Sequence, residues 1–294
     1  MNFGQVITAM VTPFDQKGEI DFQATNNLIE HLIDNGTDAV VVSGTTGESP
    51  TLSTDEKIQL FKFVVQQVAG RIPVIAGTGS NNTRESVQLT KTAEIIGVDG
   101  IMLVVPYYNR PSQEGIYEHF KMIANSTELP IMLYNIPGRT SCHMEVETVI
   151  RLSQIENIVS LKDATGDLED MTEILSQTPE HFTLYSGDDP LTLPVLSIGG
   201  HGIVSVSSHI VGNEMQDMIT AYKEGNITLA SQYHQQLLST FKAVFSAPSP
   251  SPIKALLNMQ GINVGGVRLP LLPLNEAEMR ILRKQFQVKI AHAK

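Results

Sequence analysis

The sequence has little that would tie it to an oxidising compartment or to a membrane. Its single cysteine, Cys142, cannot form an internal disulfide. No apolar run approaches the ~18 residues of a membrane-spanning helix. The first residues, MNFGQVITAM, lack the basic start and the small-residue cleavage site of a signal peptide. These absences predict a cytoplasmic protein that folds without disulfide bonds.

Positive charge is also scarce. The chain of 294 residues has 20 lysines and arginines against 31 aspartates and glutamates, which gives a net charge of −11. An acidic chain without a cluster of basic residues repels a phosphate backbone, so nucleic acid is not expected as a partner. The hydrophobic share of 41% and the charged share of 17% are those of an ordinary globular protein, which excludes a disordered or fibrous chain.

Motifs for metal and nucleotide chemistry are missing from the sequence. It contains no Gly-Lys-Ser/Thr phosphate loop, no His-x-His or His-Glu-x-x-His pair and no Gly-x-Ser-x-Gly nucleophile motif. Gly77 and Gly79 follow a candidate strand, but the third glycine of a dinucleotide-binding loop is absent. We therefore expect neither a metal ion nor a cofactor.

Eight short apolar runs alternate with helical stretches along the chain. The runs recur about every 20–35 residues, as successive strand–helix units do. Most are apolar throughout, as strands covered on both faces are. This order predicts an α/β fold, a (β/α)8 TIM barrel, although an open doubly wound sheet has the same local signals. The runs begin at Val6, Ala39, Val74, Ile101, Ile131, Ile158, Phe182 and Ile203.

Capping residues mark several predicted helices. Asp21 and Asn82 each precede an amphipathic stretch and are predicted N-caps, and Ser53 with Glu56 has the spacing of a capping box. The stretch after Asn82 ends at Gly97, a typical helix C-terminus.

The last quarter of the chain has a different pattern. After Gly225 no further strand signal appears, and three stretches, ITLASQYHQQLLSTFKAVF, PIKALLNMQG and NEAEMRILRKQFQVKIAHAK, are predicted helices. The short proline-rich SAPSPSP segment between the first two is predicted to be a rigid turn. We predict a catalytic barrel over residues 1–224 and a C-terminal helical extension over residues 225–294.

Lys162 is the unusual residue among the strand ends. It closes the apolar run IVSLK, and strand alternation places it on one face with Ile158 and Ser160. If that face lines the barrel interior, removal from water favours the neutral amine, a nucleophile that forms Schiff bases with carbonyls. The alternative is a lysine that extends to the rim and reaches water. Taken alone, Lys162 favours the alternative.

Groups that suit imine chemistry follow the neighbouring strands. Tyr134 ends its strand and supplies a phenol that can move protons. Thr45 and Thr46 lie among glycines whose amides suit a carboxylate, and Arg139 offers a planar fork for a second one. Each has an ordinary alternative: a core tyrosine, a tight strand–helix turn, a solvated charge. Together with Lys162 on one rim, they favour a Schiff-base mechanism.

Five motifs, in this order and spacing, resemble those of one enzyme family. GTTGES, VVPYYNRPSQEG, LYNIPGRT, SLKDATGDL and SGDD are similar to motifs of the dihydrodipicolinate synthase family, in the N-acetylneuraminate lyase superfamily of class I aldolases. The resemblance runs from VITAMVTPF to VRLPLLPL, nearly the whole chain. It implies a barrel with a C-terminal helical part. It also implies condensation of pyruvate with L-aspartate-4-semialdehyde to 4-hydroxy-tetrahydrodipicolinate, in diaminopimelate and lysine biosynthesis.

The resemblance further implies a role for each matching residue. Lys162 falls on the Schiff-base lysine, and Tyr134 falls on the tyrosine that relays protons. Thr45 falls on the hydroxyl between Tyr134 and Tyr108, and Tyr108 falls on the tyrosine that reaches in from a neighbouring subunit. The positions that bind substrate carboxylates are Thr46, Gly187 and Val204 for pyruvate and Arg139 for the semialdehyde.

In lysine-inhibited members of the family, the effector binds in a cleft at the subunit interface. Thr54 and Lys57 stand where inhibited members carry histidines. A fixed ammonium on Lys57 would repel the cationic side chain of the effector, so we expect L-lysine to inhibit weakly or not at all. The matching cleft positions are Ser49, Pro50, Thr54, Lys57, Asn81, Glu85 and Tyr107.

Two rival functions remain at this stage. A sugar-acid aldolase such as N-acetylneuraminate lyase shares the lysine and the tyrosine, but Tyr108 and Arg139 argue against it. A catalytically silent sensor of small acids on the same barrel has no need of Lys162. For the assembly, the resemblance implies a homo-oligomer, a dimer or a tetramer, that acts on small molecules.

Overall fold

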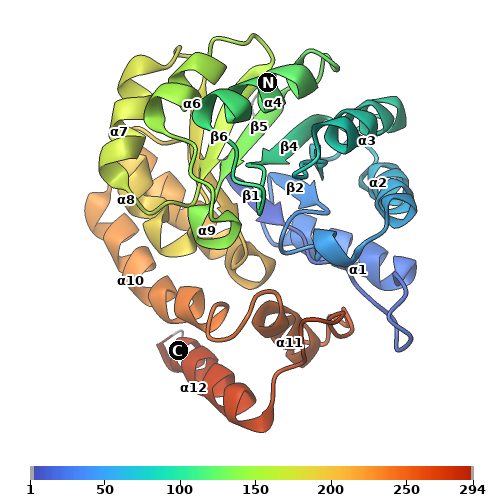
Figure 1. The fold of residues 1–294 in the computed structure, drawn as a ribbon. Coiled ribbons are helices and arrows are strands. Elements are labelled where there is room, and N and C mark those ends of the chain that lie inside the picture. Colours follow the sequence, from blue (N-terminus) through green and yellow to red (C-terminus); the bar gives the residue numbers. More distant parts are fainter. Residues whose placement is uncertain (1–2, 293–294) are drawn as a thin grey trace.

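Eight parallel strands form a closed barrel in the computed structural model, which describes residues 3–292 (Figure 1). The strands are β1 (Val6–Ala9), β2 (Ala39–Val42), β3 (Val74–Gly77), β4 (Gly100–Val104), β5 (Ile131–Asn135), β6 (Ile158–Asp163), β7 (Thr183–Ser186) and β8 (Gly202–Ser205). Each strand pairs with the next one along the chain, and β1 pairs with β8. This closure excludes the open doubly wound sheet and confirms the eight predicted strands and the (β/α)8 fold.

Two layers of buried side chains explain why the strands are apolar throughout. Ile7, Val41 and Ile75 belong to the cluster inside the barrel. Val40 and Val42 belong to the larger cluster between the strands and the helices. Because neighbouring residues of a strand point to opposite faces and both faces are covered, neither face is polar.

Helices surround the barrel, and three of them begin at the caps that the sequence predicts. Between β1 and the end of the last strand–helix unit they are α1 (Phe22–Asp34), η1 (Ser49–Thr51), α2 (Thr54–Val68), α3 (Thr83–Ile96), α4 (Gln113–Ala124), α5 (Pro137–Thr140), α6 (Val146–Leu152), α7 (Leu168–Gln177), η2 (Asp189–Leu191), α8 (Thr192–Ser197) and α9 (Ser208–Lys223). Asp21 and Asn82 accept backbone hydrogen bonds at the starts of α1 and α3, and Ser53 and Glu56 form the capping box of α2. Gly97 ends α3 in the left-handed conformation.

One expectation about β6 is wrong. Strict alternation predicts Ile158 on the same face as Lys162, but Ile158 belongs to the outer cluster. The cause is a shift of register between β5 and β6 that leaves Val159 as an extra residue packed against the interior cluster. Past this bulge the alternation resumes, and Lys162 pairs with Tyr134 of the interior cluster.

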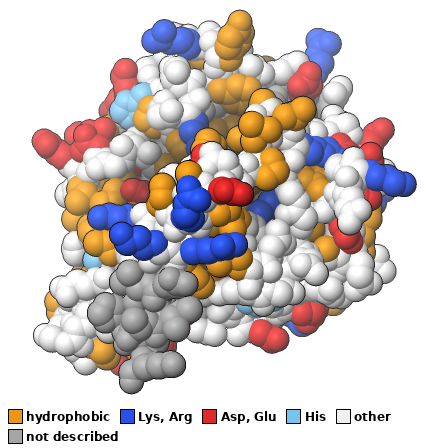
Figure 2. All heavy atoms as spheres, turned by 90° about the horizontal axis from the view of Figure 1, so that it is seen from below, with side chains coloured by type: hydrophobic (Ala, Val, Ile, Leu, Met, Phe, Trp, Pro, Cys, Tyr) orange, Lys and Arg blue, Asp and Glu red, His pale blue; other side chains and the backbone are white. Residues whose placement is uncertain are grey.

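Three helices follow α9, as the sequence predicts. They are α10 (Ile227–Ala243), α11 (Ser251–Met259) and α12 (Glu276–His292), and they lie below the barrel in Figure 1. α10 packs against α9 on one side and α12 on the other. The SAPSPSP segment ends in the first turn of α11. The predicted division between a barrel over residues 1–224 and a helical extension over residues 225–294 stays a prediction. Seen from below, the surface carries several lysine and arginine side chains beside apolar ones (Figure 2).

Over residues 3–292, no helix has both the length and the apolar character needed to cross a membrane.

Candidate active site

Lys162 lies inside the barrel, at the C-terminal end of β6. Its residue is only 5% exposed. Tyr134 stands opposite it on β5, and the Lys162 Nζ lies 3.9 Å from the centroid of the Tyr134 ring. The alternative of a lysine reaching out to water is therefore wrong. The structure brings a buried amine and a phenol together where a barrel enzyme places its catalytic groups.

Residues of the next two strands surround the Lys162 side chain. Tyr185, on β7, pairs with Lys162 of β6, and the Tyr185 hydroxyl donates to the carbonyl of Gly4 at 2.9 Å. A Cβ on Gly187 would lie 2.8 Å from the Ala164 Cβ and 3.1 Å from the Lys162 Cε, so a glycine lets the chain pass this close to the lysine. Val204, on β8, belongs to the same interior cluster as Tyr134. Val204 therefore lies in the interior layer and Gly187 lies against the lysine, while their place in a substrate pocket stays a prediction.

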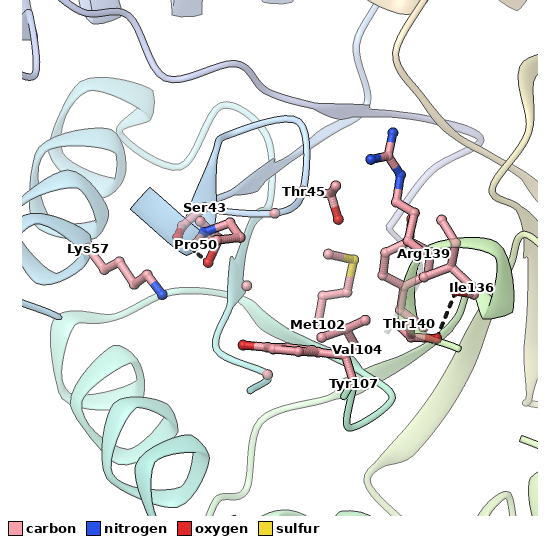
Figure 3. Close-up of a pocket in the computed structure, with 15 residues that line it drawn as sticks. Ser43, Thr45, Pro50, Lys57, Met102, Val104, Tyr107, Ile136, Arg139 and Thr140 are labelled. Carbon is pink, nitrogen blue, oxygen red and sulfur yellow. Dashed lines mark hydrogen bonds between the residues drawn. The ribbon is translucent and has the colours of Figure 1, made fainter. Parts of the chain in front are cut away.

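A cavity of about 280 Å³ opens beside this centre. It collects side chains and backbone from the loops after β2, β3, β4 and β5 (Figure 3). Its lining residues are Ser43, Gly44, Thr45, Ser49, Pro50, Lys57, Gly77, Gly79, Met102, Val104, Tyr107, Tyr134, Ile136, Arg139 and Thr140. Thr45, Tyr134 and Arg139, which the sequence singles out separately, thus share one cavity. Lys162 contacts it through the Tyr134 ring and does not itself line it.

The loop of residues 44–49 (GTTGES), called the 44–49 loop below, presents Thr45 to the cavity. The Glu48 N–H donates to the Thr45 carbonyl at 3.1 Å, and the Ser49 N–H donates to the Gly44 carbonyl at 3.3 Å. Thr46 is 5% exposed and is not among the residues that line the cavity. The tight turn predicted as an ordinary alternative is therefore present, and it is also what points Thr45 into the cavity.

Gly77 and Gly79 have a role in the cavity that the sequence analysis missed. A Cβ on Gly77 would lie 2.5 Å from the Ser43 carbonyl oxygen, and a Cβ on Gly79 would lie 2.5 Å from the Val104 nitrogen. The two glycines allow the loops after β2, β3 and β4 to approach one another at the cavity wall. Their place directly after a strand was the signal available in the sequence.

Arg139 reaches the cavity from α5, a single turn that begins with Pro137. The Thr140 hydroxyl donates to the Ile136 carbonyl at 2.8 Å, which fastens this turn to the end of β5. Arg139 itself is exposed. An exposed guanidinium on a fastened turn suits a carboxylate that arrives from solvent.

Some of the predicted effector residues line the cavity and others do not. Ser49, Lys57 and Tyr107 line the cavity, and the Lys57 ammonium and Tyr107 hydroxyl point to one end of it (Figure 3). Burial lowers the pKa of Lys57, which the charge of Glu85 opposes. Asn81 lies outside the lining, where its carbonyl accepts from the Asn109 amide at 2.9 Å.

Tyr108 does not enter its own cavity. It is 88% exposed and has a φ of +71°, a left-handed conformation that few non-glycine residues adopt. An exposed aromatic ring held in a strained turn points to a role away from its own barrel.

In the part of the chain that the structure describes, no three His, Cys, Asp or Glu side chains are grouped as a metal site would require.

A family model, curated relatives and solved structures all match this chain to the same family. The family model described as "Dihydrodipicolinate synthetase family" matches residues 2–289. The 4-hydroxy-tetrahydrodipicolinate synthase of Bacillus velezensis is 60% identical over 278 residues, 95% of this chain and 96% of that protein. A dihydrodipicolinate synthase structure from Bacillus anthracis has a TM-score of 0.96 at 57% identity, with 98% of both chains covered. The structure of the enzyme from Cyanidioschyzon merolae with lysine bound has a TM-score of 0.96 at 48% identity, again over 98% of both chains.

Proposed function

This chain belongs to the dihydrodipicolinate synthetase family, and we propose that it performs the family reaction through a Schiff base on Lys162. The reaction is the condensation of pyruvate with L-aspartate-4-semialdehyde to 4-hydroxy-tetrahydrodipicolinate. The chain is a class I lyase of diaminopimelate and lysine biosynthesis. The observation that carries the assignment of Lys162 is its buried Nζ, 3.9 Å from the Tyr134 ring centroid.

The first half of the proposed mechanism attaches pyruvate. The Lys162 amine nitrogen attacks the ketone carbon, a C–N bond forms, and the ketone oxygen leaves as water. Tyr134 gives and takes the protons that these steps move, with Thr45 as its hydroxyl partner in the cavity. Thr46, Gly187 and Val204 hold the pyruvate carboxylate. Loss of a methyl proton then gives the enamine.

The second half joins the semialdehyde. The enamine carbon attacks the aldehyde carbon to form the C–C bond, while Arg139 holds the substrate carboxylate with its planar fork. The substrate's own amine then displaces Lys162 from the imine carbon, which closes the ring and frees the enzyme. No step needs a metal ion or a redox cofactor, because the protonated imine that Lys162 forms with pyruvate accepts the electron pair of the broken C–H bond.

Borohydride trapping tests this proposal. With pyruvate and reductant, intact-mass spectrometry should show one reduced pyruvate adduct per chain, and peptide mapping should place it on Lys162. Omitting pyruvate is the control. A sensor of small acids gives no adduct. A sugar-acid aldolase gives the adduct but does not consume aspartate semialdehyde, so an assay with that substrate separates the two enzymes.

Tyr108 leads us to propose a homo-oligomer with a shared site. Its ring is too exposed to serve its own cavity, so a second copy of the chain is the natural place for its hydroxyl to meet Thr45. Tyr108→Phe should lower kcat with little change in melting temperature, and dilution below the dimer dissociation constant should abolish activity. Analytical ultracentrifugation beside the rate assay checks both. A fully active monomer contradicts the shared site. The choice between dimer and tetramer, like the cytoplasmic location, stays a prediction.

Lysine feedback is expected to be weak. The structure of the Cyanidioschyzon merolae enzyme has lysine bound, but here the Lys57 ammonium points into the cavity that Ser49 and Tyr107, two other predicted effector positions, also line. Two like charges ~4 Å apart at an effective dielectric near 20 repel by about 4 kcal/mol, more than a typical allosteric coupling of about 1–3 kcal/mol.

Initial rates across an L-lysine titration measure this effect. Lys57→Met is the matched variant, since it keeps the length of the side chain and removes its charge, and it should be inhibited more strongly than the wild type. Saturable inhibition of the wild type at low lysine concentration contradicts the repulsion argument.

A further inference from the structure

Glu48, in the 44–49 loop, carries a buried carboxylate that the mechanism does not use. It follows the two threonines after one glycine, Gly47, and has a φ of +57°, in the left-handed region. Its side chain is 1% exposed. A carboxylate removed from water needs partners at both oxygens, and an unusual backbone conformation persists only where surrounding contacts hold it.

Both oxygens of Glu48 are held by residues more than 200 positions away. The Lys254 Nζ, on α11, donates to Oε1 at 2.7 Å, and the Arg268 backbone N–H donates to Oε2 at 2.9 Å. The Lys254 ammonium also donates to the Gly266 carbonyl at 2.6 Å and lies 4.2 Å from the Phe14 ring centroid. Its side chain is 2% exposed, and burial lowers its pKa to about 8 against the opposing charge of Glu48.

Arg268 fastens the same network to the start of the barrel. Its side chain forms an ion pair with Glu56 of α2 and donates to the carbonyls of Gly18 at 2.7 Å and Thr51 at 2.8 Å. Its guanidinium carbon lies 4.4 Å from the Phe14 ring centroid. The segment before α12 is thus tied to the loops on both sides of Glu48.

The 44–49 loop is also tied to the segment that follows β1. The Thr12 hydroxyl donates to the Gly47 carbonyl at 2.7 Å. With Gly47 held there and Glu48 held by the C-terminal segment, the loop is fixed at two consecutive residues. Thr45 and Thr46 lie immediately before this fixed point, and the Glu48 N–H closes the turn onto the Thr45 carbonyl.

We propose that Lys254 and Arg268 are positioning residues, which hold Glu48 and thereby keep Thr45 and Thr46 in the geometry that receives the pyruvate carboxylate. The proposal rests on the function proposed above and adds a role for the C-terminal segment in that same site. Neither residue touches substrate. Their effect is therefore on the first substrate, whereas the turn that carries Arg139 and binds the semialdehyde is left intact.

Two variants test the two sides of the contact. Lys254→Met keeps the length of the side chain and removes the charge, and Glu48→Gln keeps the shape and removes the other charge. Each should raise the KM for pyruvate at least about tenfold while the KM for the semialdehyde stays within about threefold. The borohydride adduct should form correspondingly more slowly at low pyruvate. In the double variant the loss should be much smaller than the product of the two single losses, because the contact is already broken by either change.

A control separates positioning from loss of stability. Leu257→Ala lies on the same helix, at a fully buried position of the hydrophobic core, so it lowers the melting temperature by creating a cavity. It should leave the ratio of the two KM values unchanged. If Lys254→Met does not fold, Glu48→Gln and the double variant give the same readout.

The outcomes are distinct from those of the Schiff-base test. Wild-type enzyme that forms no adduct with pyruvate contradicts the proposed function itself. The positioning role alone is overturned if the wild-type enzyme forms the adduct and the folded variants keep the wild-type KM for pyruvate. It is also overturned if the KM values for pyruvate and for the semialdehyde rise together in these variants.

Discussion

Replacing Lys162 by alanine is expected to lower kcat by at least about 1,000-fold, because the covalent path is lost with the nucleophile. The remaining groups bind substrates but cannot form an imine. A coupled assay of product formation measures the loss, and the same variant should give no borohydride adduct. The fold should survive, since the barrel interior around the site is apolar and tolerates an alanine.

A surface lysine provides the control for this variant. Lys121 pairs with Glu118 on the exposed side of α4, so Lys121→Ala should leave both turnover and trapping unchanged. A Lys162→Ala enzyme that is well folded and condenses its substrates near the wild-type rate would rule out the Schiff base at this position.

Arg139→Ala should damage the second half-reaction and spare the first. A bidentate contact between a guanidinium and a carboxylate contributes about 2–4 kcal/mol, so kcat/KM for aspartate semialdehyde should fall about 30- to 1,000-fold. Trapping of pyruvate on Lys162 should proceed at the wild-type rate, because the lysine and Tyr134 are untouched. Steady-state kinetics with the semialdehyde varied, beside the trapping rate, separates the two half-reactions.

Arg139→Lys is the matched variant for this test. It keeps the charge but not the planar fork, so its kcat/KM should lie between those of the wild type and the alanine variant. Equal losses in trapping and in condensation would mean that Arg139 supports the α5 turn and does not bind substrate.

The sequence by itself predicted the order of strands and helices and most of the candidate site, and the closure of the sheet decided between the barrel and the open sheet. Strands buried on both faces must be apolar throughout, and eight such runs at regular spacing leave few architectures. Helix starts were also local, because a cap such as Asp21 bonds to a residue only three positions away. Lys162 was also recognisable from its local sequence, because it is a charged residue at the end of an otherwise mostly apolar strand.

Only the tertiary structure decided how the separate motifs meet. The bulge at Val159 moves Ile158 to the outer layer, and no local pattern marks it, because the two residues at the bulge are both apolar. Lys162 lies beside Tyr134 because β5 and β6 pair in that register.

The contacts of Glu48 could not be predicted from the sequence either, because they join residues that are far apart along the chain. Its partners Lys254 and Arg268 are more than 200 residues distant, and in the sequence all three are ordinary charged residues. Hydrogen bonds and packing depend on distance in space, whereas propensity and periodicity depend on distance along the chain. For this reason the sequence could predict which residues carry the chemistry, and only folding decided what holds them in place.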